Sequence, residues 1–197
     1  MSEIHFCWTR RGDTGIAPLL KVEGLSVRVG VRRILNQIDF SIHMGDHIRV
    51  TGPNGCGKST LLNAIAGVEP AHIEAGRILF VGEDITYKPP HERAALGISY
   101  MRQTDNIFVS LNVEENLNLA LGPDGYKQFT QAFPKWAGDL NARKRAGQLS
   151  GGEKKKLAWA MTALAGKKLF LADEPEAGVA QRFEIPTGVG AYVMITH

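Results

Sequence analysis

Apolar and polar positions alternate over the first patterned part of the 197-residue chain. The stretch "LLKVEGLSVRVG", beginning at Leu19, follows the two-residue period of a strand, and "QIDFSIHMGDHIRVTG" continues that period on both sides of a turn at residues 44–46. We therefore expect successive strands here, the last of which runs directly into a glycine-rich loop. The residues before Leu19 follow no period, and we expect residues 1–18 to form a polar tail.

Helical and strand periods then take turns along the chain. "KSTLLNAIAG" has Leu61, Leu62 and Ile65 at helical spacing and Gly67 at an expected helix end, and a strand pattern follows in "GRILFVGEDI". A short helix is expected in "PPHERAALG", which begins at a proline, and a further strand in "GISYMRQ". Strands that alternate with helices predict an α/β sheet.

The second half of the chain adds a charged helical region and two more strands. Residues 113–146 are mostly helical in pattern and are broken at "GPDG", and "KLAWAMTAL" then places apolar residues on one stripe of a helix. "KLFLADEP" is a short apolar run that ends in carboxylates, which is typical of a buried parallel strand. The next strand is expected to begin near Ala191.

Composition narrows the classes of protein that fit. Hydrophobic residues make up 44% of the chain, enough for one well-buried domain with a subdomain, and a net charge of +3 is small for a dedicated nucleic-acid binder. Two cysteines, Cys7 and Cys56, give neither a disulfide framework nor a zinc site, which favours a reducing compartment. The N-terminus lacks the apolar core of a signal peptide, and no run of about 18 apolar residues could cross a bilayer.

A phosphate-binding motif stands where a strand meets a helix. "GPNGCGKS" matches the pattern G-x-x-x-x-G-K-[ST], in which glycines let backbone N–H groups turn toward phosphates. Lys58 would reach the β- and γ-oxygens, Ser59 would offer its hydroxyl to Mg²⁺, and the helix would point its positive end at the anion. A glycine-rich turn could match by chance, but the strand–loop–helix context that the motif requires is present. The predicted phosphate-binding residues are Gly52, Pro53, Asn54, Gly55, Cys56, Gly57, Lys58, Ser59 and Thr60.

Two carboxylates, Asp173 and Glu174, follow the apolar run "LFLA". Ligands of open α/β sheets bind at the carboxyl ends of the strands, where the first carboxylate can support Mg²⁺ and the second can orient or deprotonate an attacking water. The alternative is an acidic pair that caps the next helix, which the phosphate loop disfavours. A GTPase would carry a guanine-reading N-K-x-D motif, which this chain lacks, and a small-molecule kinase would not need the segment at residues 147–161.

That segment, "GQLSGGEKKKLAWAM", holds a second turn suited to phosphate, because Ser150, Gly151 and Gly152 open a helix. "GPNGCGKST", "QLSGGE" and "LFLADEP", in this order, resemble the nucleotide-binding subunit of an ATP-binding cassette (ABC) protein, and the resemblance covers residues 19–197. It implies a P-loop NTPase (RecA-like) α/β core with an N-terminal antiparallel β subdomain and a helical subdomain over residues 104–148.

The resemblance further implies an active site that two subunits share. In the family, the LSGGE turn faces away from its own phosphate loop and contacts the γ-phosphate held by a second ABC subunit, identical or different, so that two subunits enclose two ATP molecules. Gln103 would sense Mg²⁺ and the γ-phosphate, Glu174 would activate water, and His197 in "VMITH" would contact the γ-phosphate. The contacts implied for the turn are Ser150, Gly151, Gly152 and Glu153, and those implied for the metal are Ser59, Gln103 and Asp173.

Partners and location also follow from the resemblance. Thr104–Val109 lies where family members dock onto integral membrane transporter subunits, so we expect a protein that uses ATP and Mg²⁺ on the cytoplasmic face of the inner or plasma membrane. "ERAALGI" and "EAGVA" are most similar to the ATPases of branched-chain amino-acid importers and lipopolysaccharide exporters. The basic runs at residues 143–145 and 154–156 predict a solvated face and no nucleic-acid partner, because no aromatic residues are interleaved with them.

Three features depart from the family pattern. Val29 stands where the family usually has an aromatic residue that stacks on adenine, and Ala180 stands at the usual D-loop aspartate. Residues 181–190, "QRFEIPTGVG", are too few for the helix of a parallel crossover, which needs about 12 residues to span a strand. Either the connection is an extended bypass, or residues of the real polypeptide are absent there. Because the chain also stops at His197, where the family continues with further strands, we expect absent residues between Ala180 and Ala191 and after His197.

The leading hypothesis is an ATPase subunit that dimerises around ATP and drives a membrane transporter. Two alternatives stay open at this point. One is a soluble ABC ATPase for assembly or repair, which usually carries two cassettes or large insertions that this chain does not show. The other is a regulatory module that binds nucleotide and scarcely hydrolyses it, which the substitution at Val29 would suit.

Overall fold

The computed structural model describes residues 4–9, 17–104, 106–165, 168–177, 183, 185 and 190–196. Its strands are β1 (His5–Thr9), β2 (Leu20–Val29), β3 (Arg32–Ile42), β4 (His47–Thr51), β5 (His72–Phe80), β6 (Glu83–Asp84), β7 (Ile98–Met101), β8 (Leu169–Asp173) and β9 (Ala191–Ile195). Its α-helices are α1 (Lys58–Ala66), α2 (Pro90–Leu96), α3 (Val113–Leu121), α4 (Gly125–Ala132), α5 (Pro134–Asp139) and α6 (Gly151–Ala163).

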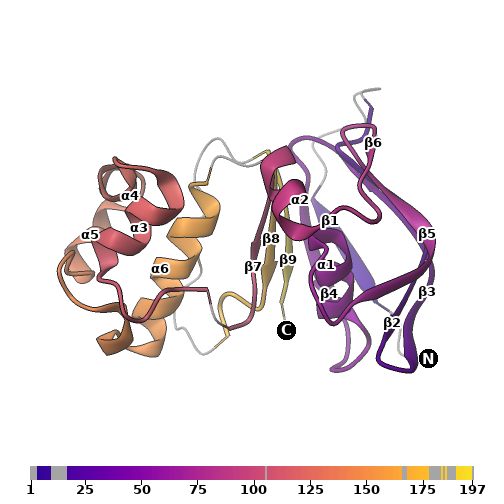
Figure 1. The fold of residues 1–197 in the computed structure, drawn as a ribbon, viewed down its shortest axis with the longest axis horizontal. Helices are drawn as coiled ribbons and strands as arrows, with labels where there is room; N and C mark the ends of the chain where they lie inside the picture. Colours follow the sequence, from indigo (N-terminus) through magenta and orange to yellow (C-terminus); the bar gives the residue numbers. More distant parts are fainter. Residues whose placement is uncertain are drawn as a thin grey trace.

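These elements form layers (Figure 1). Helices α3 to α6 make one outer layer, and the sheet that contains β7, β8 and β9 lies next to it. On the other side of that sheet lie α1 and α2, followed by the antiparallel sheet that contains β2, β3 and β5. The α/β fold predicted from the sequence is confirmed.

The central sheet has five strands in the order β1-β4-β9-β8-β7. Strands β4, β9, β8 and β7 run parallel, and every residue of β8 is buried, as its apolar sequence predicts. Because parallel strands end at one edge of the sheet, the residues that follow β4, β8 and β7 meet there. This edge therefore brings together the phosphate loop, the carboxylate pair and the segment of Gln103.

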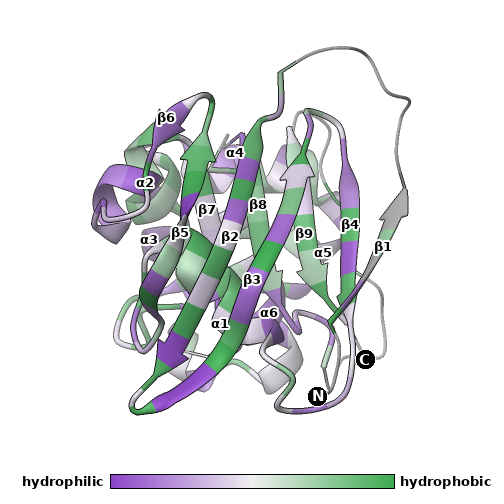
Figure 2. Ribbon diagram, turned by 90° about the vertical axis from the view of Figure 1, so that its right-hand side faces the viewer, coloured by the Kyte–Doolittle hydropathy of each residue, from purple (hydrophilic) through white to green (hydrophobic). Residues whose placement is uncertain are grey.

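The second sheet is antiparallel, in the order β3-β2-β5-β6. Hydrophilic and hydrophobic residues alternate along β2 and β3 in Figure 2, because one face of the sheet packs on the core and the other meets solvent. The buried side chains of β2 include Leu20, Val22, Leu25 and Val27. The strands predicted from Leu19 to Ile42 are present as β2 and β3.

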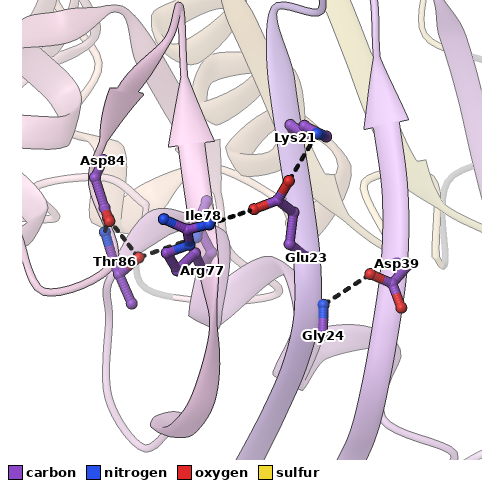
Figure 3. A network of polar contacts seen from close by, with 8 residues as sticks. All are labelled: Lys21, Glu23, Gly24, Asp39, Arg77, Ile78, Asp84 and Thr86. Carbon is purple, nitrogen blue, oxygen red and sulfur yellow. Dashed lines mark hydrogen bonds and ion pairs between the residues drawn. The ribbon is translucent and has the colours of Figure 1, made fainter.

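Polar contacts run across the solvent face of the antiparallel sheet (Figure 3). Glu23 binds Lys21 at 2.6 Å and Arg77 at 3.2 Å, and these two cations lower the pKa of the exposed Glu23 carboxyl. Asp39 accepts the backbone N–H of Gly24 at 2.8 Å. Exposed pairs of this kind stabilise a fold weakly, so we assign them to solubility and strand pairing rather than to a site.

An aromatic core holds the helical layer on the central sheet. Trp159 of α6 lies 4.9 Å from Phe170 of β8, measured between ring centroids, in an edge-to-face arrangement. Phe183 contacts both Trp159 and Trp136, each at 5.2 Å between centroids. Helix α6 is thereby fixed against the strand that leads to Asp173.

The C-terminal end of α1 is closed by Arg93 of α2, which is 3% exposed. Its guanidinium donates to the carbonyls of Ala64 at 2.6 Å and Ile65 at 2.8 Å, and also to that of Thr86 at 2.9 Å. A cation suits this end of a helix because the last carbonyls are negative. Burial lowers the pKa of Arg93 to about 10, which still leaves it charged at neutral pH.

Three predictions differ from the structure. His5–Thr9, expected within a polar tail at 1–18, instead forms β1, an edge strand antiparallel to β4, and an edge strand needs no strict apolar alternation. The two strands in "QIDFSIHMGDHIRVTG" are present but belong to different sheets. The stretch "GRILFVGEDI" is divided into β5 and β6 by a turn at residues 81–82, where both φ angles are positive.

Candidate functional site

The phosphate loop joins β4 to α1 and depends on its glycines. Gly52, Gly55 and Gly57 have φ angles of 147°, 77° and 108°. A Cβ atom on Gly57 would lie 2.8 Å from Leu35 and 2.9 Å from Ile34, so both conformation and space require glycine there. Among the described residues, no side chain caps the start of α1 and no acidic residue lies in its first turn. Its amide groups and positive dipole are therefore available to an anion.

Lys58 lies across this loop. Its ammonium donates to the carbonyl oxygens of Gly52 at 2.7 Å and Pro53 at 3.1 Å, and the residue is only 6% exposed. The loop thus holds the charge in place beside the start of α1. Cys56 of the loop is also buried.

A cleft of about 550 Å³ opens in front of the loop, within the usual range for small-ligand sites. The loop and α1 contribute one part of its wall, the β2–β3 hairpin a second, and the ends of β7 and β8 a third. The lining residues are Val29, Arg32, Ile34, Asn54, Gly55, Gly57, Lys58, Ser59, Thr60, Gln103 and Glu174.

Asp173 is a buried carboxylate beside this cleft. It is 4% exposed, and its Oδ1 atom has no hydrogen-bond partner among the described residues. Burial raises its pKa, and the charge of Glu174 adds to the rise, while the Ser59 hydroxyl and the Lys58 charge lower it. A buried carboxylate with an unsatisfied oxygen next to a hydroxyl suits a hard cation that prefers oxygen ligands.

Mg²⁺ therefore fits the donors that are present. Asp173 and Ser59 would hold it together with phosphate oxygens and water. Gln103, the third predicted contact to the metal, also lines the cleft, where its amide donates to Glu174.

Glu174 and Gln103 meet at the mouth of the cleft, although 71 residues separate them in sequence. The Gln103 amide donates to the Glu174 carboxylate at 3.2 Å. Glu174 has a φ angle of 48°, an unfavourable left-handed conformation for a residue other than glycine. This residue of unfavourable backbone conformation lines the cleft.

Tyr100 is a residue of this region that the sequence analysis missed. Its hydroxyl donates to Asn63 of α1 at 3.0 Å. Burial raises its pKa, and so does the nearby charge of Asp173. Only the register of β7 against β8 places Tyr100 beside this carboxylate, and sequence spacing alone does not give that register.

The LSGGE turn forms the start of α6 and is internally capped. Ser150 Oγ accepts the Glu153 N–H at 3.2 Å, and Glu153 Oε2 accepts the Ser150 N–H at 2.6 Å. These bonds to Ser150, followed by the ion pair with Lys144, lower the pKa of Glu153. The Glu153 carboxylate thus has a capping role that its S-x-x-E spacing could have indicated. None of the cleft residues identified above comes from this turn.

The solvated basic face predicted at residues 154–156 is wrong for two of the three lysines. Lys155 donates to the carbonyls of Glu174 and Ala177, and Lys156 pairs with Asp139 at 2.9 Å while its ammonium lies 5.9 Å from the Trp136 ring centroid. All three lysines are half-buried. The sequence of a charge run does not reveal such tertiary contacts, because each partner comes from another element.

Two of the predicted positions cannot be placed in this site. His197 and Ala180 lie outside the described residues, as does most of the short connection before β9. Ala191 does begin a strand, which pairs in parallel with β8 and β4, as expected. In the part of the chain that the structure describes, no helix has both the length and the apolar character needed to cross a membrane.

Sequence comparisons give one family. The family model described as "ABC transporter" matches residues 35–177. A probable branched-chain amino acid transport ATP-binding protein LivF of Archaeoglobus fulgidus is 39% identical over 157 residues, covering 76% of this chain and 65% of that protein. The lipopolysaccharide export system ATP-binding protein LptB of Haemophilus influenzae is 32% identical over 168 residues, covering 82% of this chain and 69% of that protein.

Solved structures give the same fold. An ATP-binding cassette of an ABC transporter matches with a TM-score of 0.71 and 26% identity, over 92% of this chain and 82% of that chain. The same cassette in its ADP conformation matches with a TM-score of 0.70 over the same shares. The chain thus spans only part of the length of these proteins: 65% of the LivF relative, 69% of the LptB relative and 82% of the solved cassette.

Proposed function

This chain belongs to the ABC transporter family, and from that premise we propose that it binds and hydrolyses ATP to power transport through membrane subunits. One observation carries the proposal. The uncapped start of α1 and the Lys58 ammonium line the same cleft as Glu174 and Gln103, with the buried carboxylate of Asp173 beside it. An anion site that adjoins a metal-binding carboxylate and a potential base suits phosphoryl transfer to water.

Binding of the triphosphate would use the loop from Gly52 to Thr60. The α1 amides and the Lys58 ammonium would contact phosphate oxygens in place of the carbonyls to which Lys58 now donates. Mg²⁺, held by Ser59 and Asp173, would neutralise charge on the β- and γ-phosphates. The Asp173 carboxylate would then gain a partner for its unsatisfied oxygen.

Hydrolysis would depend on Glu174. Its carboxylate would take a proton from a water molecule as the water oxygen attacks the γ-phosphorus and the bond to the β-phosphate bridging oxygen breaks. Gln103, which donates to Glu174 at 3.2 Å, would hold the carboxylate in position at the mouth of the cleft. His197 is proposed as a further γ-phosphate contact on the basis of its motif alone.

Closure of the site would require a second subunit. Ser150, Gly151 and Gly152 stand at the start of α6 but are absent from the lining of this chain's own cleft. The Ser150 hydroxyl accepts one hydrogen bond and keeps its proton to donate to another acceptor. We propose that this turn contacts the γ-phosphate in a partner cassette, in a two-fold arrangement that uses both turns at once.

Transport is the favoured use of this ATPase, because the relatives reported above are named transport and export ATP-binding proteins. Phe108 and Val109, in the segment predicted to dock on membrane subunits, are 54% and 59% exposed. Two adjacent exposed apolar side chains support a protein contact there. The proposed location is the cytoplasmic face of the membrane.

The proposal is tested by the dependence of ATP hydrolysis on protein concentration. Since each complete site would need two chains, the rate of phosphate release per chain should rise with concentration until dimers dominate. Phosphate release is measured with Mg²⁺ and saturating ATP over about a hundredfold range of protein. A per-chain rate that stays constant over that range, while light scattering shows only monomers, would rule out sites shared between two copies, and no release at any concentration would rule out the ATPase.

We predict that Arg32 contacts the adenine base of ATP. Val29 and Arg32 are cross-strand partners beside the hairpin tip, and both line the cleft, whereas Arg33 points to the other face and binds Glu74 at 2.7 Å. A planar guanidinium can stack on a purine where an aromatic residue is missing. Arg32→Ala should therefore raise the Kd for ATP about fivefold. Displacement of a fluorescent ATP analogue measures the change.

Arg33→Ala is the matched control for this prediction, because Arg33 lies one residue away and bonds to Glu74 outside the cleft. It should leave the Kd for ATP unchanged. Equal weakening by the two variants would mean that general positive charge, and not stacking by Arg32, contributes the affinity.

A further inference from the structure

The side chain of Lys155 connects the signature helix to the segment that carries the proposed base. Lys155 lies on the second turn of α6, four residues after Gly151. Its ammonium donates to the carbonyl oxygen of Glu174 at 3.4 Å and to that of Ala177. The turn that follows β8 therefore has both of its ends bound to one side chain of a different element.

This turn needs support from outside. Glu174 has a φ angle of 48°, a conformation that costs a non-glycine residue free energy. Within the turn, the Ala177 N–H donates to the Glu174 carbonyl at 3.2 Å. The Lys155 ammonium adds a charged donor to the same carbonyl, and hydrogen bonds from charged donors are the stronger kind.

Lys155 is in turn well fixed. It is half-buried, and the helix that carries it packs through Leu157 and Trp159, both fully buried. Trp159 contacts Phe170 of β8, three residues before Asp173. Core packing thus fixes the helix that carries Lys155 relative to the end of β8.

We propose that Lys155 is a positioning residue that holds the Glu174 backbone in its strained conformation, and that it links the LSGGE turn to the catalytic carboxylate of the same chain. The proposal rests on the proposed ATPase function for its kinetic consequence. Helix α6 begins at the turn that would meet the partner's nucleotide and carries Lys155 one turn later. A shift of α6 on contact with that nucleotide would therefore move the turn that presents Glu174.

Steady-state kinetics test the catalytic part. Lys155→Ala should lower kcat for ATP about tenfold, because the carboxylate is less well positioned, and leave the Kd for ATP unchanged, because Lys155 does not line the cleft. Lys155→Arg should restore most of the activity, since it keeps a charged donor. Lys154→Ala, one residue away on the same helix and without these contacts, should behave as the parent chain.

A double variant tests whether Lys155 acts through Glu174. With Glu174→Gln already present, adding Lys155→Ala should lower the residual rate no further. An additional tenfold loss in that background, or an equal loss from Lys154→Ala, would overturn the proposal.

Hydrogen–deuterium exchange of the chain without nucleotide tests the structural part independently of hydrolysis. Lys155→Ala should speed exchange at the Ala177 amide at least fivefold, while the amides of β8 and the exchange pattern of Lys154→Ala stay as in the parent. Unchanged exchange at Ala177 would refute the proposal even if the chain proved to be a poor ATPase. Loss of activity in every chain, with the exchange result as expected, would count against the ATPase function alone.

Discussion

Replacement of Glu174 by glutamine is expected to lower kcat for ATP by about 10³-fold and to leave ATP bound. Glutamine has nearly the same shape but does not accept a proton from the attacking water. Its side chain keeps an oxygen that can accept the Gln103 amide, so the local hydrogen bond found at 3.2 Å is preserved. The loss therefore reports proton transfer and not a collapsed cleft.

The same variant is expected to accumulate as a dimer with ATP, because hydrolysis is the step proposed to reopen the pair. Phosphate release gives the rate, and light scattering after size-exclusion chromatography with ATP and Mg²⁺ gives the mass. Glu176→Gln is the matched control. Glu176 lies two residues away and accepts the Phe183 N–H at 2.9 Å, a bond that glutamine retains, so this control should hydrolyse ATP normally. A Glu174→Gln chain that stays monomeric would contradict the shared site.

Replacement of Lys58 by alanine has the second-largest expected effect, a rise of about 10²-fold in the Kd for ATP together with loss of hydrolysis. Lys58 is 6% exposed and has two carbonyl oxygens as partners, so its charge is already oriented at the start of α1. Two charge-assisted contacts with phosphate oxygens account for a change of this size.

Isothermal titration with ATP and Mg²⁺ measures the effect of the Lys58 change. Lys135→Ala, which removes the same charge from an exposed position on α5, controls for the change in net charge and should bind ATP as the parent does. If the two variants bound ATP equally well, the triphosphate would have to lie somewhere other than the phosphate loop.

The site was predictable where a motif and its element coincide in sequence. The loop from Gly52 to Thr60 and the strand before Asp173 and Glu174 each carry a local pattern, and the structure places both at the edge of the parallel sheet. Gln103 was found through resemblance alone, and its contact with Glu174 spans 71 residues.

Contacts that depend on packing escaped prediction. Lys155 reaches Glu174 and Ala177, Tyr100 lies near Asp173, and Arg93 closes the end of α1, but each partner is set by how helices and strands dock. A half-buried lysine and a solvated one look alike in a charge run, because the aliphatic stem tolerates both environments. Strand β1 was missed for a related reason. Its backbone pairs with β4, a strand distant in sequence, and residues 5–9 alone do not indicate that pairing.

The capping box at Ser150 and Glu153 has a consequence for how the proposed pair of subunits would associate. Its two reciprocal hydrogen bonds, of 3.2 Å and 2.6 Å, both form within a single chain, so the LSGGE turn has its conformation without a second subunit. Ordering a loop at the moment of encounter would oppose association through lost conformational entropy. In the proposed pair of subunits, a preorganised turn would avoid that penalty at each association, so the two subunits would associate and separate repeatedly without any local folding step.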